Sequence, residues 1–210
     1  MLAWSLTTFS AIFFVVDPIA VVPIFLAMTP GDNEGHRASM ARRASLIAGV
    51  VLVAFAFGGT ALFHLFGVSL PAFKVAGGVL LLLTALDQLR SHEPETRTSG
   101  GEIAEGRAKD DIAVVPLALP LLAGPGSIAT VIVLAADARE TWQSVVLTAS
   151  ILCTAGLSWA VLGVAGRIDG ALGATGKAVF LRVSGLLLAA VGVQFVLTGV
   201  GEAFPALLAR

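Results

Sequence analysis

Residues 14–23 read FVVDPIAVVP and residues 116–127 read PLALPLLAGPGS, so proline and glycine interrupt two long apolar stretches near their middles. Proline inside a helix removes a backbone hydrogen bond and clashes with the preceding turn. In hydrocarbon the freed carbonyl groups have no water to bind, so such breaks persist only where protein or a wet cavity satisfies them. Interrupted apolar segments at corresponding positions in two halves of a chain are typical of a transporter's binding site.

The composition places the chain in a membrane. Of its 210 residues 57% are hydrophobic and only 13% are charged, and the mean hydropathy is +0.92, well above soluble usage. A hydrocarbon core about 30 Å thick needs roughly 20 helical residues to cross it. Charge-poor runs of about this length cover residues 4–28, 44–66, 72–89, 112–136, 144–164 and 179–200. We therefore predict an all-α membrane protein of six transmembrane helices, with the first and fourth broken near the midplane.

The two halves of the chain are similar in pattern. Residues 90–111 are polar and predict a mobile cytoplasmic linker between a first three-helix repeat, residues 1–89, and a second, residues 112–210. The matching residues, separated by 107, 107 and 108 positions, are Pro18 and Pro125, Gly59 and Gly166, and Gly77 and Gly185. Because each repeat has an odd number of crossings, the second inserts upside down. This predicts an inverted repeat within one membrane domain.

The basic residues predict the orientation of the helices. Ten of the thirteen Lys and Arg residues fall in the loops between segments one and two, three and four, and five and six. They are Arg37, Arg42, Arg43, Arg90, Arg97, Arg107, Lys109, Arg167, Lys177 and Arg182. Since basic loops stay in the cytoplasm, both termini are expected outside. Trp4 and Trp142 fall at predicted outer ends, where indole rings prefer the headgroup region.

Both interruptions resemble helix starts. Asp17-Pro18 combines a carboxylate that can cap free amides with a proline that favours the first helical position. In Gly124-Pro125-Gly126-Ser127, glycine permits a sharp turn and a close approach of the backbone. Two such half-helices would direct unpaired N–H groups and positive dipole ends toward an anion such as a substrate carboxylate. The prolines expected to break the helices are Pro23, Pro116 and Pro120.

Asp17 is the only charged residue predicted deep inside a span. A carboxylate there costs about 2.5–3.5 kcal/mol on translocon scales, so Asp17 is a candidate to bind a substrate amine, Na⁺ or a proton. Capping its own half-helix is the structural alternative. Gln194, in the sixth segment, is a second polar candidate that could bond across helices or line a pathway. Gly185, Gly192 and Gly199 form a small-residue stripe on that segment, and Gln194 lies roughly opposite Gly185.

Other site chemistries have no signature in the sequence. It contains no G-x-x-x-x-G-K-[ST] phosphate loop, so an ATP-driven engine in this chain is not expected. The histidines lack metal-ligand spacing, and the single cysteine, Cys153, cannot form an intramolecular disulfide. No second buried acid or Ser-His pair accompanies Asp17, which argues against an intramembrane hydrolase. We expect no enzyme activity, no cofactor, no nucleic-acid partner and no metal site, apart from Na⁺ or a proton at Asp17.

At these motifs the chain resembles the MarC family of UPF0056-type integral membrane proteins, whose members include proposed neutral amino-acid transporters. The resemblance runs from about residue 4 to residue 200, and its most specific parts are residues 17–19 with 22–25, 116–127, and 182–190 with Gln194. It implies a bacterial inner-membrane protein that moves glycine- or alanine-like amino acids, coupled to Na⁺ or H⁺. Many relatives have Gly-Asn where this chain has Ala20-Val21, so one amide that could bind the solute or ion is absent.

The preferred hypothesis is a secondary transporter of small neutral amino acids. Its candidate substrate-binding residues are Asp17, Pro18, Gly124, Pro125, Gly126, Ser127 and Gln194. The expected partners are the amino-acid substrate and membrane lipid, and a homo-oligomer is an open alternative. An exporter of metal or other small ions is a second hypothesis, although the spans contain few further carboxylates and no His or Cys cluster. A nontransporting membrane scaffold is a third, but it leaves two matching interruptions without a purpose.

Overall fold

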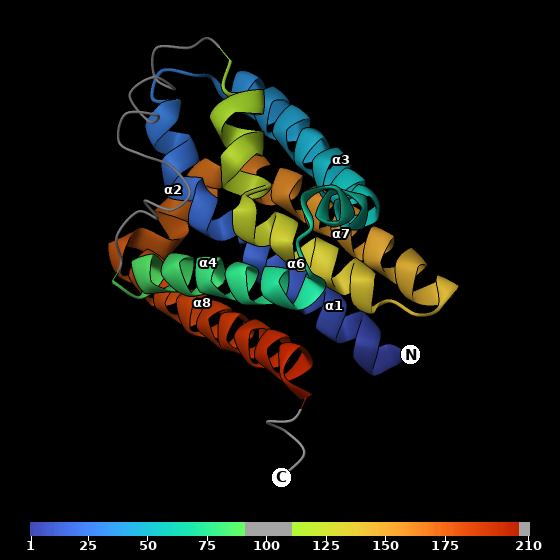
Figure 1. The fold of residues 1–210 in the computed structure, drawn as a ribbon. Coiled ribbons are helices and arrows are strands. Elements are labelled where there is room, and N and C mark those ends of the chain that lie inside the picture. Colours follow the sequence, from blue (N-terminus) through green and yellow to red (C-terminus); the bar gives the residue numbers. More distant parts are fainter. Residues whose placement is uncertain (91–110, 206–210) are drawn as a thin grey trace.

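The computed structural model describes residues 1–90 and 111–205, and every element in these ranges is helical (Figure 1). In chain order the elements are α1 (Leu2–Val16), α2 (Pro18–Met28), α3 (Glu34–Phe66), α4 (Leu70–Leu89), η1 (Ala113–Leu122), α6 (Pro125–Asp137), α7 (Thr141–Gly163) and α8 (Ala165–Ala203). Apart from its first and last residue, the predicted linker 90–111 lies outside the described residues.

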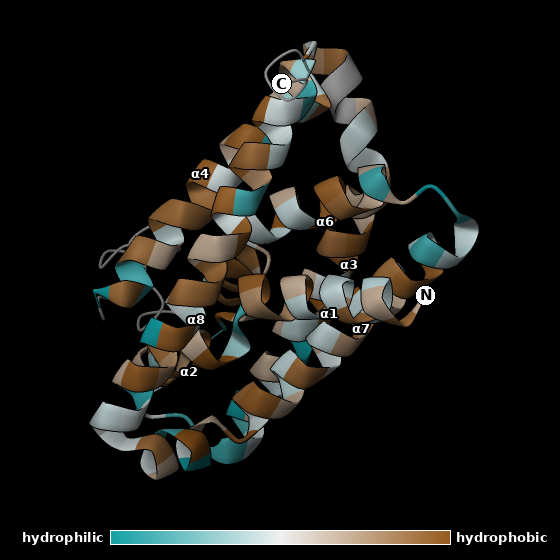
Figure 2. Ribbon diagram, turned by 90° about the horizontal axis from the view of Figure 1, so that it is seen from below, coloured by the Kyte–Doolittle hydropathy of each residue, from teal (hydrophilic) through white to brown (hydrophobic). Residues whose placement is uncertain are grey.

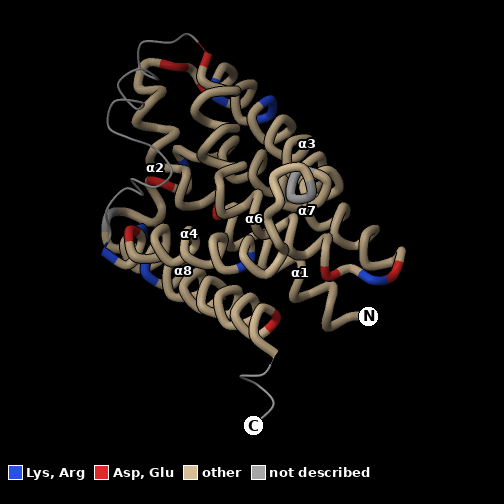
Figure 3. Tube along the Cα trace, viewed as in Figure 1, with Lys and Arg blue, Asp and Glu red and all other residues tan. Residues whose placement is uncertain are grey.

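The helices match the predicted membrane spans. Over the described residues, five helical stretches are long and apolar enough to cross a membrane, one of them Leu2–Met28 with its turn at Asp17, and the bent pair of η1 and α6 makes up to a sixth. Apolar residues dominate the helices in Figure 2, while Figure 3 shows most charged residues near helix ends and loops. This distribution is expected for helices that face hydrocarbon, and it confirms the all-α membrane class.

The first span is interrupted at Asp17. This residue ends α1 in the left-handed conformation, with φ 48° and ψ 64°, and Pro18 then begins α2. The Asp17 Oδ1 atom accepts a hydrogen bond from the Ala20 N–H at 3.3 Å, so its side chain caps the second helix as expected. Pro23 lies inside α2, and the helix continues through it. The break expected at Pro23 is therefore not seen, because losing one N–H in the second turn leaves the surrounding helical bonds in place.

The second interruption is longer. Within η1, Val115 and Leu119 have extended dihedrals, and each precedes a proline, as expected from the crowding that proline imposes on the residue before it. The peptide bonds to these two prolines, Pro116 and Pro120, are cis. The axes of η1 and α6 then differ by 59°. Pro116 and Pro120 thus lie where the chain departs from a regular helix.

The interrupted spans occupy the interior of the bundle. In an apolar 18-residue window of the Leu2–Met28 span, 61% of the residues are buried, against 28–39% in the four spans without an interruption of this kind. The α6 segment contributes a run of buried residues, Ala129, Thr130, Val131, Ile132 and Val133. Asp17 and Gly124 are buried among the other helices, as expected for irregular backbone in a membrane, whereas the extended residue Val115 of η1 is 47% exposed.

Helix α4 packs closely against the part of α8 that follows the kink at Gly173 (Figure 1). A Cβ atom placed on Gly78 of α4 would lie 2.5 Å from the backbone oxygen of Gly192 on α8. The other stripe residues, Gly185 and Gly199, would likewise lie within 3.4 Å of atoms of α4. The small-residue stripe of the sixth segment therefore faces α4, where it allows the two backbones to approach each other.

Contacts at the helix ends join elements that are distant in sequence. The rings of Trp4 and Trp142 meet edge to face, with centroids 5.5 Å apart, so the two predicted interface residues lie on the same side of the bundle.

At the predicted cytoplasmic ends, Arg37 donates to the Thr29 carbonyl oxygen beyond α2. Arg43 forms an ion pair with Asp111 before η1. These arginines thus fix helix ends as well as fitting the orientation prediction.

The α4–α8 contact predicts a specific effect of Gly78→Ala. The new methyl group would meet the Gly192 backbone oxygen, which cannot rotate away. We expect a loss of roughly 1–3 kcal/mol, the usual cost of overpacking, seen as a lower thermal unfolding midpoint of the purified protein in detergent. Gly156→Ala in α7 is the control, because a Cβ atom there meets nothing within 4 Å. Equal midpoints for the two variants would contradict the close contact.

Candidate functional site

A buried carboxylate–amide pair joins the first interruption to α4. Asp17 is 2% exposed and Gln88, near the end of α4, is 0% exposed. The Gln88 Nε2 atom donates a hydrogen bond to Asp17 Oδ2 at 2.7 Å. With the Ala20 N–H on Oδ1, both carboxylate oxygens accept hydrogen bonds. These bonds offset part of the cost of burying the charged group, and they tie α4 to the start of α2.

The start of α6 presents the predicted backbone donors. Gly124 precedes the helix without a side-chain cap, and the first intrahelical acceptor is the Gly124 carbonyl oxygen, bonded to the Ile128 N–H at 3.0 Å. Over the described residues, the N–H groups of Gly126 and Ser127 have no hydrogen-bond acceptor. The Ser127 hydroxyl donates to the Leu122 carbonyl oxygen at 3.1 Å, so it holds the turn rather than adding a free donor. The free groups are therefore backbone amides at the positive end of a helix dipole.

A small cavity lies against this helix start. Its volume is about 30 Å³, room for about two water molecules. Its lining residues are Val15, Leu80, Leu81, Thr84, Gly124, Pro125, Gly126 and Ser127. A Cβ atom on Gly126 would lie 2.8 Å from Leu81 Cδ2 and 3.8 Å from Val15 Cγ1. Glycine is thus needed here for the α6 backbone to approach α4 and α1, and four of the predicted site residues share one cavity.

The two interruptions contact α4 at different positions along its axis. Gly126 approaches Leu81, near the middle of α4, whereas Asp17 bonds to Gln88, one residue before its end. Seven residues of helix separate these points by roughly 10 Å along the axis. The interruptions are therefore offset along α4 rather than level with each other. Their depth in the bilayer stays a prediction.

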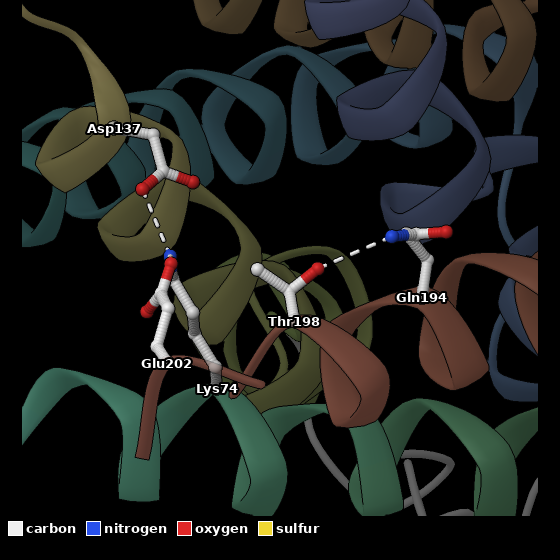
Figure 4. Close-up of polar contacts among 5 residues, drawn as sticks. All are labelled: Lys74, Asp137, Gln194, Thr198 and Glu202. Atoms are coloured by element: carbon white, nitrogen blue, oxygen red, sulfur yellow. Dashed lines mark hydrogen bonds and ion pairs between the residues drawn. The ribbon is translucent and has the colours of Figure 1, made fainter. Parts of the chain in front are cut away.

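The remaining predicted site residues lie in different surroundings. Pro18 is buried at the first position of α2, beside Asp17. Gln194 is exposed on α8, and its Nε2 donates to Thr198 Oγ1 on the same helix at 3.2 Å (Figure 4). It does not line the cavity of the α6 start. The structure thus brings Gln88, rather than Gln194, to Asp17.

Sequence reasoning missed Gln88. One sequence feature could have pointed to it: Gln88 is a polar residue in the last turn of an apolar segment. It lies four residues after Thr84 and therefore on the same helix face as this second polar residue. What the sequence lacked was its partner, which is 71 residues away. Over the described residues, no group of three or more His, Cys, Asp or Glu side chains could hold a metal ion.

A second charged cluster, also missed, lies at the predicted outer ends of three helices. Lys74 of α4 is 1% exposed, and its Nζ atom lies 2.9 Å from Asp137 Oδ1 and 2.7 Å from Glu202 Oε1 (Figure 4). The two acids belong to the ends of α6 and α8. Lys74 thus holds together the second half of the interrupted span and the α4–α8 pair.

The cluster predicts the result of a charge-removal series. In Asp137→Asn with Glu202→Gln, the buried Lys74 loses both anionic partners, and we expect a loss of up to roughly 3 kcal/mol. Breaking a fully buried ion pair costs about 3–5 kcal/mol, and we expect no more than the low end of this range because the side chains of both acids are nearly half exposed, at 48% and 41%. Adding Lys74→Met should restore much of the thermal unfolding midpoint, since no buried charge is then left alone. A triple variant no more stable than the double variant would refute this role of the lysine.

Known sequences resemble the chain over nearly its whole length. A UPF0056 membrane protein of Methanocaldococcus jannaschii is 36% identical over 199 residues, 95% of this chain and 97% of that protein. YvbG of Bacillus subtilis is 33% identical over 208 residues, 99% of both chains. YhcE of Escherichia coli is 32% identical over 200 residues, 95% of this chain and 93% of that protein. Both are also named UPF0056 membrane proteins.

No solved structure matches the chain. The family description that fits it is that of the MarC family integral membrane proteins, and the match covers residues 2–204. This range includes both interruptions, the Asp17–Gln88 pair and the cluster around Lys74. The chain therefore belongs to the MarC family of integral membrane proteins.

Proposed function

We propose that the protein is a secondary transporter of small neutral amino acids. The observation that carries this proposal is the placement, inside one helical bundle, of a buried carboxylate–amide pair and, roughly 10 Å away along α4, a helix start with free backbone amides. An amino acid carries a carboxylate and an ammonium group, so it needs donors for one end and a negative charge for the other. Such paired chemistry is hard to explain in a membrane scaffold, because polar groups inside hydrocarbon are costly.

The two ends of the substrate have separate partners in this proposal. Its carboxylate binds the N–H groups of Gly126 and Ser127, where the α6 dipole favours an anion. Its amine, or a coupling Na⁺ or H⁺, is drawn toward Asp17. Val15, two residues before Asp17, and Thr84, four residues before Gln88, line the cavity at the start of α6, so the chain near both polar residues borders this cavity although neither residue lines it.

The packing supports an inverted repeat as the transport machinery. In the proposed alignment α3 corresponds to α7 and α4 to α8, and the members of each pair pack against each other. Two elements related by a twofold axis that passes between them are expected to meet in this way. Rocking one repeat against the other would then expose the site to either side of the membrane.

The small cavity indicates a closed conformation in this proposal. About 30 Å³ holds roughly two water molecules, which is less than the volume of alanine. Substrate binding therefore requires α4 and the start of α6 to separate. We place the protein in the bacterial inner membrane with both termini outside, as the basic loops predict.

A flux assay on purified protein in liposomes tests the function. We expect radiolabelled glycine or alanine to move down an imposed Na⁺ or pH gradient, with no movement in liposomes lacking protein. Flux of metal ions alone would favour an ion exporter. If no solute moved under any gradient, the scaffold hypothesis would replace the transporter.

Asp17→Asn should abolish most of this flux. The asparagine keeps the size of the side chain but removes the charge that attracts the amine or the coupling cation. We expect at least a tenfold loss of initial rate, equivalent to about 1.4 kcal/mol or more, with a normal gel-filtration profile. Asp32→Asn, in the loop between α2 and α3, is the control and should transport normally. Wild-type flux in Asp17→Asn would remove Asp17 from the mechanism.

Gly126→Ala should weaken substrate binding. The added methyl group enters the space between α6 and Leu81, next to the proposed carboxylate site. We expect a higher KM for alanine with a smaller change in kcat, because ground-state binding is affected first. Gly163→Ala, where a Cβ atom meets nothing within 4 Å, is the matched control. An unchanged KM would place the carboxylate elsewhere.

A further inference from the structure

Gln88 has an acceptor that the described structure leaves unused. Its side chain is 0% exposed, and its Nε2 atom is occupied by Asp17 Oδ2 at 2.7 Å. Its Oε1 atom is buried and has no hydrogen-bond partner among the described residues. Leaving a buried carbonyl oxygen unpaired costs roughly 1–3 kcal/mol, so such an atom calls for an explanation.

The Asp17 carboxylate determines the orientation of the Gln88 side-chain amide. A carboxylate oxygen only accepts hydrogen bonds, so the NH₂ group of Gln88 must face it and the carbonyl oxygen must point elsewhere. Asp17 therefore sets which end of the amide is free. The free end is the negative one, and it lies beside a second negative group, a pairing suited to a positively charged donor.

The packing around Gln88 holds its side chain in place. A Cβ atom on Gly185 of α8 would lie 3.0 Å from Gln88 Cβ, so the stem of the glutamine is enclosed between α4 and α8. Thr84 lies one turn earlier on the same face of α4, about 6 Å along the axis, and lines the cavity at the start of α6. Gln88 thus continues the helix face that borders the proposed carboxylate site.

We propose that Gln88 is a substrate-binding residue whose Oε1 atom accepts a hydrogen bond from the protonated amine of the transported amino acid. This inference rests on the proposed transport function and assigns one half of the substrate to a specific atom. Gln88 binds the amine directly and, through Nε2, orients the Asp17 carboxylate, which supplies the negative charge. The residue then selects α-amino acids over acids of the same size that lack the amine.

The predicted consequence is a loss of selectivity in Gln88→Met. Methionine has a similar shape but offers no amide oxygen. We expect the variant to bind alanine roughly 10–100-fold more weakly, the range for a hydrogen bond to a charged group, while propionate, the analogue without the amine, binds as before. Affinities are measured by competition with radiolabelled glycine in liposomes. Asp32→Asn, in the loop between α2 and α3, is the control and should keep wild-type selectivity.

A spectroscopic measurement on the wild-type protein avoids dependence on the variant's folding. The chain has three glutamines, Gln88, Gln143 and Gln194, so ¹³C labelling of glutamine side-chain carbonyls gives three signals in solid-state NMR of the liposomes. Single substitutions of Gln143 and Gln194 assign them. We expect alanine to shift the Gln88 signal and propionate to leave it unchanged.

The outcomes separate this inference from the function on which it rests. Equal weakening of alanine and propionate in Gln88→Met would show a merely structural role and overturn the inference, with transport intact. The inference would also be overturned by a Gln88 signal that does not shift under saturating alanine, or by one that Na⁺ alone shifts. If the wild-type protein neither binds nor moves any amino acid, the proposed function itself fails, and the assignment of the amine fails with it.

Discussion

The need to satisfy backbone polar groups away from water governs this structure. Two of its spans cannot be continuous helices, because Asp17 adopts a left-handed conformation and the prolines of η1 force extended residues before them. Such backbone is tolerated in a membrane only inside protein. Asp17 and Gly124 accordingly lie buried inside the bundle, where a solute site is expected, while the start of η1 is half exposed.

Helix α4 connects the features of this interior. One face carries Gly78, which brings the α8 backbone into direct contact. Lys74 near its start holds the ends of α6 and α8, and Gln88 near its end holds the Asp17 carboxylate. These two residues are fourteen positions apart, or about 21 Å along the axis. In the proposed transporter, a movement of α4 would alter both polar contacts at once, which gives the helix a natural part in opening and closing the site.

The charges of the two clusters are handled differently. Lys74 is itself buried, but its acidic partners are nearly half exposed, so the cluster reaches water at one side. Asp17 and Gln88 are both buried, at 2% and 0% exposure, so this pair lies inside the bundle. This difference suits a structural role for the first cluster and a binding role for the second.

Hydropathy and the dihedral limits of proline and glycine act over a few residues, so the sequence alone determined the all-α membrane class with its five to six candidate spans and pointed to the irregular backbone at Asp17 and around Gly124. Only the tertiary structure decided the partners. Gln88 meets Asp17 across 71 positions, and Lys74 meets its acids across 63 and 128. It also showed that α2 continues through Pro23 and that Gln194 lies exposed. Such pairings depend on how helices pack in three dimensions, and no short-range pattern in the chain encodes them.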